Sequence, residues 1–273
     1  MTVNCLLYYI IFIVLVILVW NKYSGDGLMK KKLVIICVAF LLITLAAITV
    51  EAKPNKSKML VKKADITGDG VKDEVTLKEY SIRKHGNNSK KTIISLKLSN
   101  GKTQEINLRN GQNPKLVLVD FNNDGVKEIF VRFAKGGTME HQLFSFKDSI
   151  FKEWSVPELP TIQGQFSNGY KAKITIQETK MYYMLKLNSR KENYDSLGIY
   201  RNGKVNEPTE LVIRPYGGFN QTQVHENEMG LKGVQIISGI GKTDTIAFVE
   251  SYYSWVNGNW TLQKAKVLEV NHH

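Results

Sequence analysis

Two nine-residue stretches decide the fold, DITGDGVKD at residues 65–73 (the first loop) and DFNNDGVKE at residues 120–128 (the second loop). Both place oxygen-bearing side chains at positions one, three and five, glycine at position six and an acid at position nine. Ca²⁺ takes six to eight oxygen ligands at about 2.3 to 2.6 Å, and alternating side chains converge on one point when the chain curls around it. Glycine permits the sharp turn, and position seven offers its carbonyl oxygen. The two stretches therefore predict two calcium loops.

The loops differ from EF-hands, because an EF-hand needs a glutamate at position twelve and a following helix. Position twelve is Thr76 in one loop and Val131 in the other, and strand-like runs follow at residues 74–77 and 129–133. We therefore expect each loop to join two strands. The candidate metal ligands are Asp65, Thr67, Asp69, Val71 and Asp73 in the first loop, and Asp120, Asn122, Asp124, Val126 and Glu128 in the second.

The chain beyond residue 53 reads as a series of short strands, because apolar and polar residues alternate with period two and no stretch has helical spacing. The composition, with 43% hydrophobic and 23% charged residues, is that of a folded globular protein. No linker-like segment interrupts residues 53–273, so one domain is expected. The predicted strands are residues 92–98, 104–108, 115–119, 142–146, 172–176, 182–187, 211–213, 234–237, 245–249 and 261–270.

Hairpin turns are predicted at the Asn-Gly pairs 100–101, 202–203 and 257–258, with a weaker one at Asp148-Ser149. Asn-Gly tolerates the positive φ angles of a tight primed turn. The turns recur at intervals of 48 to 55 residues, and the two loops begin 55 residues apart. That period is typical of a four-stranded propeller blade. The sequence therefore predicts an all-β fold of about four antiparallel, β-propeller-like quasi-repeats; the alternative is chance spacing in a hairpin-rich β protein.

On these residues the sequence resembles the FG-GAP or VCBS-type repeats of integrin-like β-propellers, whose D-x-[NTD]-x-D-G-x-x-[DE] loops join two strands and hold Ca²⁺. The resemblance is carried by the two loops and extends over residues 58–156. Residues 157–273 keep hairpins but contain no such loop. The resemblance implies a calcium-binding adhesive module with fewer repeats than a full propeller ring.

Two uncharged apolar stretches, residues 3–20 and 33–50, precede this domain, and each approaches the length of a membrane span. Residues 29–52 have the layout of a signal peptide: a basic start, an apolar core, and small residues before a polar chain. Residues 1–28 are then an untranslated upstream extension, with Met29 as the true start, or the first of two transmembrane helices. Either interpretation predicts one or two apolar helices and places residues 53–273 outside a bacterial cell, secreted or in its envelope.

The exported part is expected to contain no disulfide, because both cysteines, Cys5 and Cys37, lie in the apolar stretches. The chain carries a formal net charge of +12, which favours anionic surfaces over long range. For an exported protein the expected partner is an anionic wall polymer, a glycan or another protein, rather than nucleic acid. Contact with a membrane is expected only through an uncleaved N-terminal segment. A basic surface with no partner is the alternative.

No catalytic motif stands out in the sequence. Residues 239–243 read GIGKT but lack the first glycine of a phosphate-binding loop and lie between predicted strands. The five histidines show no zinc-ligand spacing, and no G-x-S-x-G elbow occurs. We therefore predict a non-enzymatic binding module with no catalytic residue and no cofactor besides calcium. The alternatives are a secreted hydrolase with structural calcium sites and a self-associating envelope component.

Three tryptophans, Trp154, Trp255 and Trp260, lie in or beside predicted hairpins. Exposed rings at such positions can stack on sugars or on a partner protein, whereas buried rings fill gaps between sheets. The sequence leaves both roles open.

Overall fold

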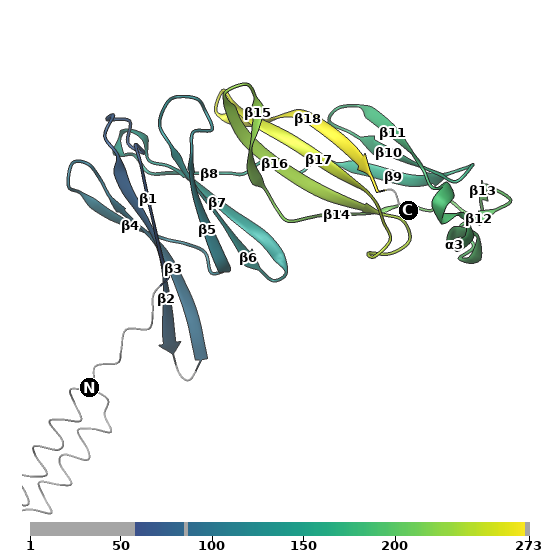
Figure 1. Cartoon of the computed structure of the whole chain (residues 1–273), viewed down its shortest axis with the longest axis horizontal. Helices are drawn as coiled ribbons and strands as arrows, with labels where there is room; N and C mark the ends of the chain where they lie inside the picture. Colours follow the sequence, from purple (N-terminus) through teal and green to yellow (C-terminus); the bar gives the residue numbers. More distant parts are fainter. Residues whose placement is uncertain (1–57, 85–86, 271–273) are drawn as a thin grey trace, which may run out of the picture. The chain divides into compact units, whose positions relative to one another are not determined.

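The computed structural model describes residues 58–84 and 87–270 (Figure 1). The chain divides into two compact units, Met1–Asn55 and Lys56–His273. The predictions for residues 1–28 and 29–52, including Cys5, Cys37 and the apolar helices, lie outside the described residues. Within the described ranges, no helix is both long enough and apolar enough to cross a membrane.

Two four-stranded antiparallel sheets form the first half of the described chain (Figure 1). Each is a meander, in which strands that follow one another along the chain are neighbours in the sheet. The first meander contains β1 (Lys58–Ala64), β2 (Asp73–Lys84), β3 (Asn87–Lys97) and β4 (Thr103–Asn107). The second meander contains β5 (Gln112–Val119), β6 (Glu128–Lys135), β7 (Thr138–Ser145) and β8 (Lys152–Trp154), with the 3-10 turn η1 (Lys147–Ser149) before β8.

The second half is built differently, from a three-stranded and a five-stranded antiparallel sheet. The three-stranded sheet contains β9 (Ile162–Ser167), β10 (Lys171–Ile176) and β11 (Met181–Lys186). The five-stranded sheet contains β14 (Val212–Pro215), β15 (Asn220–His225), β16 (Glu228–Ser238), β17 (Thr245–Val256) and β18 (Asn259–Glu269). Between them lie η2 (Asn188–Arg190), α3 (Lys191–Ser196) and a small hairpin of β12 (Tyr200–Arg201) and β13 (Lys204–Val205).

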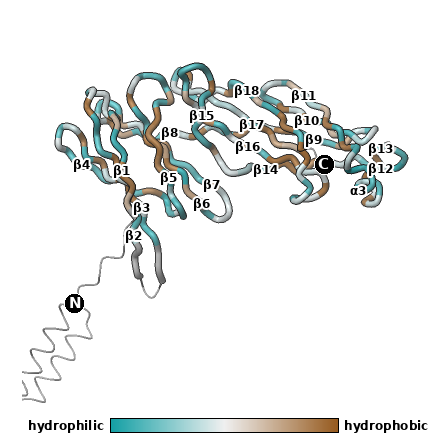
Figure 2. Tube along the Cα trace, in the orientation of Figure 1, coloured by the Kyte–Doolittle hydropathy of each residue, from teal (hydrophilic) through white to brown (hydrophobic). Residues whose placement is uncertain are grey.

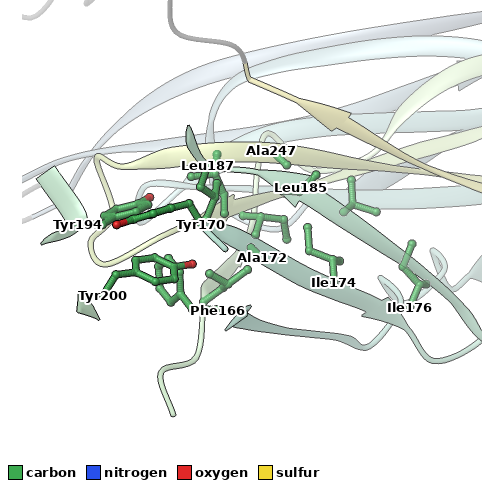
Figure 3. Packing of buried hydrophobic residues seen from close by; sticks show 14 of the residues in the cluster. Phe166, Tyr170, Ala172, Ile174, Ile176, Leu185, Leu187, Tyr194, Tyr200 and Ala247 are labelled. Carbon is green, nitrogen blue, oxygen red and sulfur yellow. The ribbon is translucent and has the colours of Figure 1, made fainter. Parts of the chain in front are cut away.

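Three hydrophobic cores hold these sheets together, and the hydrophobic residues fall mainly on the strands (Figure 2). The first core packs the two meanders on each other. The second core joins the second meander to the five-stranded sheet. The third core joins the three-stranded sheet to the five-stranded sheet and includes Tyr194 of α3 and Tyr200 of β12 (Figure 3). All three consist of residues from Lys56–His273, so this unit carries its own core.

Strand β6 shows how one sheet serves two cores. Ile129, Val131 and Phe133 belong to the first core, whereas the intervening Phe130 belongs to the second. Successive strand residues point to opposite faces of a sheet, so a strand covered on both faces carries an unbroken apolar run. The second meander is therefore covered on both of its faces.

The all-β, antiparallel prediction is confirmed, and each predicted strand overlaps a strand of the structure. The finer prediction of about four quasi-repeats holds only in part: β15 to β18 again pair in chain order, but β14 joins their sheet, β9 to β11 form only three strands, and no closed barrel or propeller ring forms among the described residues. The Asn202-Gly203 turn closes only the two-residue strands β12 and β13. Helix α3 was missed because its six residues are too few to show a 3.6-residue period.

The predicted turns occur, but one has a different conformation. At Asn202-Gly203 and Asn257-Gly258 both residues have positive φ, as a primed turn requires. At Asn100-Gly101 only the glycine does, with φ of 82°, and its N–H donates to the Leu98 carbonyl at 2.9 Å. The primed-turn prediction is therefore wrong at this hairpin, whose extra loop residue brings Ser99 into the turn.

The tryptophans fill the gap between the second meander and the five-stranded sheet. Trp154 of β8 stacks on Trp255 of β17, with ring centroids 4.1 Å apart and planes within 2°. Trp260 of β18 meets Trp255 edge to face at 5.2 Å, and its Nε1–H donates to the Ser155 carbonyl at 2.8 Å. These contacts favour the packing role over ligand stacking.

His141 of β7 is held at the same junction. Its ring stacks on Phe130 at 5.6 Å, and its Nε2 accepts a hydrogen bond from the Phe219 N–H at 2.8 Å. Burial, together with the nearby charge of Arg132 and against the opposing contact with the Phe219 backbone, lowers the pKa of His141 to about 4. The folded protein therefore favours the neutral form of the His141 imidazole.

We expect stability to fall as the pH drops from 6.5 to 4. Below pH 6.5 the unfolded chain protonates His141 while the folded protein does not, so unfolding is favoured until the folded ring also protonates near pH 4. Allowing for partial exposure, the loss should be about 2 kcal/mol. Urea denaturation at several pH values measures it. His141→Phe should flatten this part of the curve relative to the exposed control His225→Gln; parallel curves would contradict the assignment.

Candidate metal-binding loops

Each loop joins two antiparallel strands, as predicted. The first loop connects β1 to β2 and the second connects β5 to β6, so both occupy the same place in their meanders. The position-nine acids, Asp73 and Glu128, are the first residues of β2 and β6. Both are buried, with exposed fractions of 0% and 1%. The two stretches therefore share a structural role as well as a sequence pattern.

In the first loop, the carboxylates accept hydrogen bonds from the backbone of the loop itself. Asp65 Oδ1 accepts from the Gly68 N–H at 2.6 Å, and its Oδ2 accepts from the Gly70 N–H at 2.8 Å. Asp73 Oδ2 accepts from the Ile66 N–H at 3.0 Å and from the Thr67 hydroxyl at 3.3 Å. The loop is therefore curled around its first and last acids.

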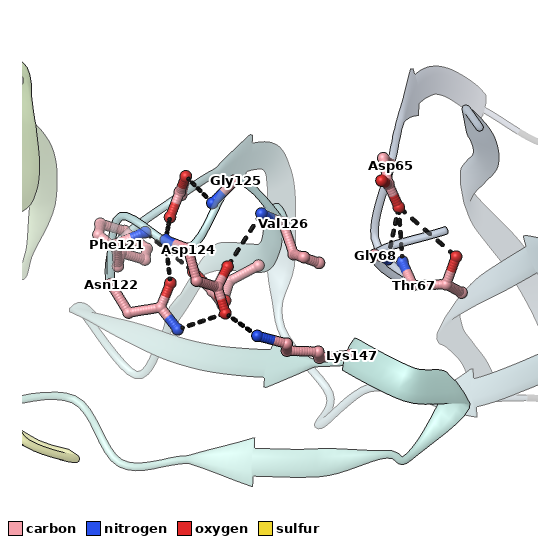
Figure 4. Close-up of polar contacts among 11 residues, drawn as sticks. Asp65, Thr67, Gly68, Phe121, Asn122, Asp124, Gly125, Val126 and Lys147 are labelled. Carbon is pink, nitrogen blue, oxygen red and sulfur yellow. Dashed lines mark hydrogen bonds and ion pairs between the residues drawn. The ribbon is translucent and has the colours of Figure 1, made fainter. Parts of the chain in front are cut away.

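The second loop repeats this arrangement (Figure 4). Asp120 Oδ2 accepts from the Gly125 N–H at 2.9 Å, as Asp65 does from Gly70. Glu128 Oε2 accepts from the Phe121 N–H at 2.9 Å, as Asp73 does from Ile66. Asn122 Nδ2 donates to Asp124 Oδ2 at 3.0 Å. Matching positions in the two loops thus make matching bonds.

In both loops the backbone N–H of the residue at position seven donates a hydrogen bond to the aspartate at position five. Val71 donates to Asp69 Oδ1 at 2.8 Å, and Val126 donates to Asp124 Oδ1 at 2.9 Å. The Val71 side chain is exposed, whereas Val126 is buried. This difference follows from the contact between the two loops.

The two loops contact each other. Lys127 N–H of the second loop donates to the Asp65 carbonyl of the first at 2.9 Å, and the Asp148 N–H donates to the Thr67 carbonyl at 2.8 Å. The Val126 side chain lies so close to Gly68 that a Cβ there would approach it to 3.1 Å. Gly68 also has φ of 87°, so a side chain at this position would be strained. The meanders are therefore joined at their aspartate loops.

A residue before each hairpin turn reaches the position-five aspartate, and sequence reasoning missed both. The Ser99 hydroxyl, between β3 and β4, donates to Asp69 Oδ2. Lys147 Nζ, between β7 and β8, donates to Asp124 Oδ2 at 2.9 Å. Both precede turns that the sequence did mark, so the available signal was the equivalent place of the two turns in consecutive repeats.

The charges differ between the loops because of these partners. The hydrogen bond from the Ser99 hydroxyl lowers the pKa of Asp69. Burial opposes ionisation of Asp124, but hydrogen bonds from Lys147, the Val126 N–H and Asn122 together lower its pKa. Its Lys147 partner has a raised pKa, chiefly through the same bond. The second loop thus has an internal ammonium where the first has a neutral hydroxyl.

The surroundings of Glu128 oppose ionisation of its carboxyl group. Burial, opposed by the hydrogen bond from the Phe121 N–H and helped by the nearby carboxylates of Asp124 and Asp120, raises the pKa of Glu128 to about 8. The side chain is 1% exposed. A buried carboxylate costs much free energy to ionise unless a positive group compensates it.

The oxygen donors of both loops suit a hard cation in type, since they are carboxylate, amide, hydroxyl and carbonyl oxygens. Across residues 58–84 and 87–270, however, no three His, Cys, Asp or Glu side chains are already gathered as a metal site. The structure brings the acids of each loop into one turn, with their oxygens bonded to backbone N–H groups. Calcium binding therefore stays a prediction.

Comparison with known proteins places the second half of the chain. Residues 160–268 match the family model of the YybI C-terminal domain. The chain is also 26% identical over 222 residues to "Uncharacterized protein YybI" of Bacillus subtilis (strain 168), covering 74% of this chain and 82% of that protein. No solved structure matches. The residues that match the family model contain the three- and five-stranded sheets almost entirely, and the two aspartate loops precede those residues.

Proposed function

We propose that this chain is an exported, non-enzymatic binding module whose two aspartate loops bind Ca²⁺ and lock the two meanders together. The observation that carries the proposal is the contact between two matched loops, made by the Lys127 N–H and the Asp65 carbonyl. A turn that stabilised only its own pair of strands would not need to contact a second turn of the same sequence pattern. In this proposal the first and second meanders are two blades of the FG-GAP or VCBS type.

Calcium would supply positive charge to two turns that hold several acids each. Its binding would be coupled to folding, because the ligands come together only in the folded loop. Where no divalent ion is bound, the Lys147 ammonium provides a counter-charge to Asp124, 2.9 Å away. The proposed ligands are the side chains of Asp65, Thr67, Asp69 and Asp73 with the Val71 carbonyl, and those of Asp120, Asn122, Asp124 and Glu128 with the Val126 carbonyl.

The binding role and the location outside the cell are supported by sequence features. Residues 29–52 have the layout of a signal peptide, and the chain carries a formal net charge of +12. An exported basic protein meets anionic wall polymers, glycans and other proteins, and long-range attraction favours the anionic ones. We therefore place the module in the bacterial envelope or secreted, with an anionic wall polymer as its leading partner.

The calcium proposal predicts a metal-dependent effect of two single substitutions. Asp69→Ala and Asp124→Ala should each lower the melting temperature in Ca²⁺ and change it little in chelator, because the metal stabilises only the folded loop. At about a hundred times its dissociation constant, each lost site should cost about 2.7 kcal/mol. Thermal melts in both buffers measure this, with the exposed Glu105→Ala as the control for charge. Equal losses in calcium and chelator would contradict the proposal.

A further inference from the structure

The three-stranded sheet has one buried face and one exposed face. On β10, Ala172 and Ile174 enter the third core, while Lys171 and Lys173 between them are exposed. Cross-strand partners point to the same side of a sheet. Lys186 pairs with Lys171, and Met184 pairs with Lys173, so both lie on the exposed face. We call this exposed side the lysine face; it includes Gln165, Lys171, Lys173, Tyr182, Met184 and Lys186.

The positive charges of these lysines are not balanced by carboxylates bonded to them. Lys171 and Lys186 are directly opposite each other on neighbouring strands, an arrangement of like charges that destabilises a sheet. Among the described residues, none of Lys171, Lys173 and Lys186 forms an ion pair with a carboxylate. An acid on this side, Glu210, lies opposite Gln165 at the far border of β9.

The exposed side of the five-stranded sheet, by contrast, holds an acid, Glu250, among its lysines. There Lys232 Nζ lies 2.7 Å from Glu250 Oε1, and the Tyr252 hydroxyl donates to the other oxygen of Glu250 at 2.6 Å. Glu250 thus partners Lys232 on that face, where the exposed Lys264 and Lys266 of β18 also lie, opposite Tyr252 and Glu250. Glu269 accepts the Lys186 backbone N–H at 3.2 Å, at the open edge of β11, and leaves the Lys186 ammonium without an ion pair. The lysine face therefore has three ammonium groups that no ion pair of the described residues neutralises.

We propose that the lysine face binds a linear polymer of phosphodiester units that carries no bases. This inference takes the binding role proposed above as its premise and names the surface. Lys171 and Lys173 are two residues apart on one strand, about 7 Å, so they present repeated positive charge to an extended anion. Lysine ammonium groups bind phosphate as point charges.

Other anionic partners fit this face less well. Successive bases need several aromatic platforms, and the face offers one exposed ring, Tyr182, over which the Lys173 ammonium already lies at 5.3 Å from the centroid. A membrane-inserting patch needs an apolar centre, because charge is costly in the bilayer interior. Here the central strand β10 supplies the lysines, and the exposed Met184 and Tyr182 lie on the edge strand β11.

Binding to immobilised poly(glycerol phosphate) tests the proposal with residues 53–273. The variant Lys171→Gln/Lys173→Gln/Lys186→Gln should bind at least tenfold more weakly than wild type. The control Lys97→Gln/Lys102→Gln/Lys152→Gln removes the same charge from exposed positions of the meanders and should bind like wild type. The logarithm of the wild-type binding constant should fall linearly with the logarithm of salt concentration, because binding releases counterions from the polymer.

Two further arms separate the sources of binding. Oligothymidylate and phosphatidylglycerol vesicles should bind more weakly than the polymer. Equal loss in both triple variants would overturn the proposal in favour of net charge alone, and tighter binding to oligonucleotide or vesicles would overturn it in favour of those partners. Melts of the lysine-face variant in Ca²⁺ and chelator distinguish this failure from failure of the calcium loops, since the calcium response should be unchanged.

Discussion

Replacing Asp244 with alanine should destabilise the protein by about 3 to 5 kcal/mol, because it leaves the buried, charged Arg190 side chain without its acidic partner. Asp244 forms an ion pair with Arg190 through Oδ1, and its Oδ2 accepts the Tyr194 hydroxyl at 2.7 Å and the Ile240 N–H at 3.2 Å. The Arg190 side chain is 11% exposed and that of Asp244 is 17% exposed. This network ties η2 and α3 to the connection between β16 and β17.

The expected loss has a specific origin that a second variant can test. If the stranded guanidinium is the cause, Arg190→Met combined with Asp244→Leu should recover a substantial part of the stability, since apolar replacement of a buried pair is often neutral. Urea denaturation provides the free energies of unfolding. Glu74→Ala, which removes a more exposed carboxylate paired with Lys63, should cost less than about 1 kcal/mol. A double variant as unstable as Asp244→Ala alone would contradict this account.

Phe121→Ala should cost about 3 to 5 kcal/mol, the range for deleting a buried aromatic ring. Phe121 is 1% exposed and occupies position two of the second loop. Its ring meets Phe130 edge to face at 5.9 Å and Trp260 at 5.3 Å, so it carries the loop into the second core. The equivalent residue of the first loop, Ile66, is buried in the first core. Position two thus anchors each loop in a different core.

The Phe121 substitution also separates packing from metal binding. The backbone N–H that Phe121 donates to Glu128 remains in the alanine variant. Its calcium-induced rise in melting temperature should therefore persist on a lower baseline. Phe151→Ala, at a ring that is 40% exposed, should cost less than half as much. Thermal melts with and without calcium measure both effects; a Phe121→Ala protein as stable as Phe151→Ala would contradict the assigned core.

Local patterns in the sequence predicted local structure well. The nine-residue loops, the strands around them and the hairpin turns depend on residues close together in the chain, so their spacing is visible before folding. Asp73 and Glu128 each begin the strand after their loop, but their burial was not predicted from the sequence. These elements place the candidate site in both meanders.

Contacts between distant residues escaped prediction. Ser99 and Lys147 reach Asp69 and Asp124 across 30 and 23 residues, and a turn motif does not state which side chain it presents to a neighbouring loop. The predicted third repeat failed for a similar reason. An Asn-Gly pair specifies a tight turn, but the sheet that its strands join is decided by packing far away in the sequence.

A thermal melt of residues 53–273 in excess EDTA, followed by titration with Ca²⁺ and with Mg²⁺ for comparison, tests the calcium proposal most directly. At about a hundred times the dissociation constant, each site should add about 2.7 kcal/mol. For a domain of this size, that corresponds to a rise of roughly 5 to 10 °C per site. A rise specific to Ca²⁺ and abolished stepwise by Asp69→Ala and Asp124→Ala is the predicted result. An unchanged melting temperature at millimolar Ca²⁺ would contradict it and leave the two loops as hydrogen-bonded turns alone.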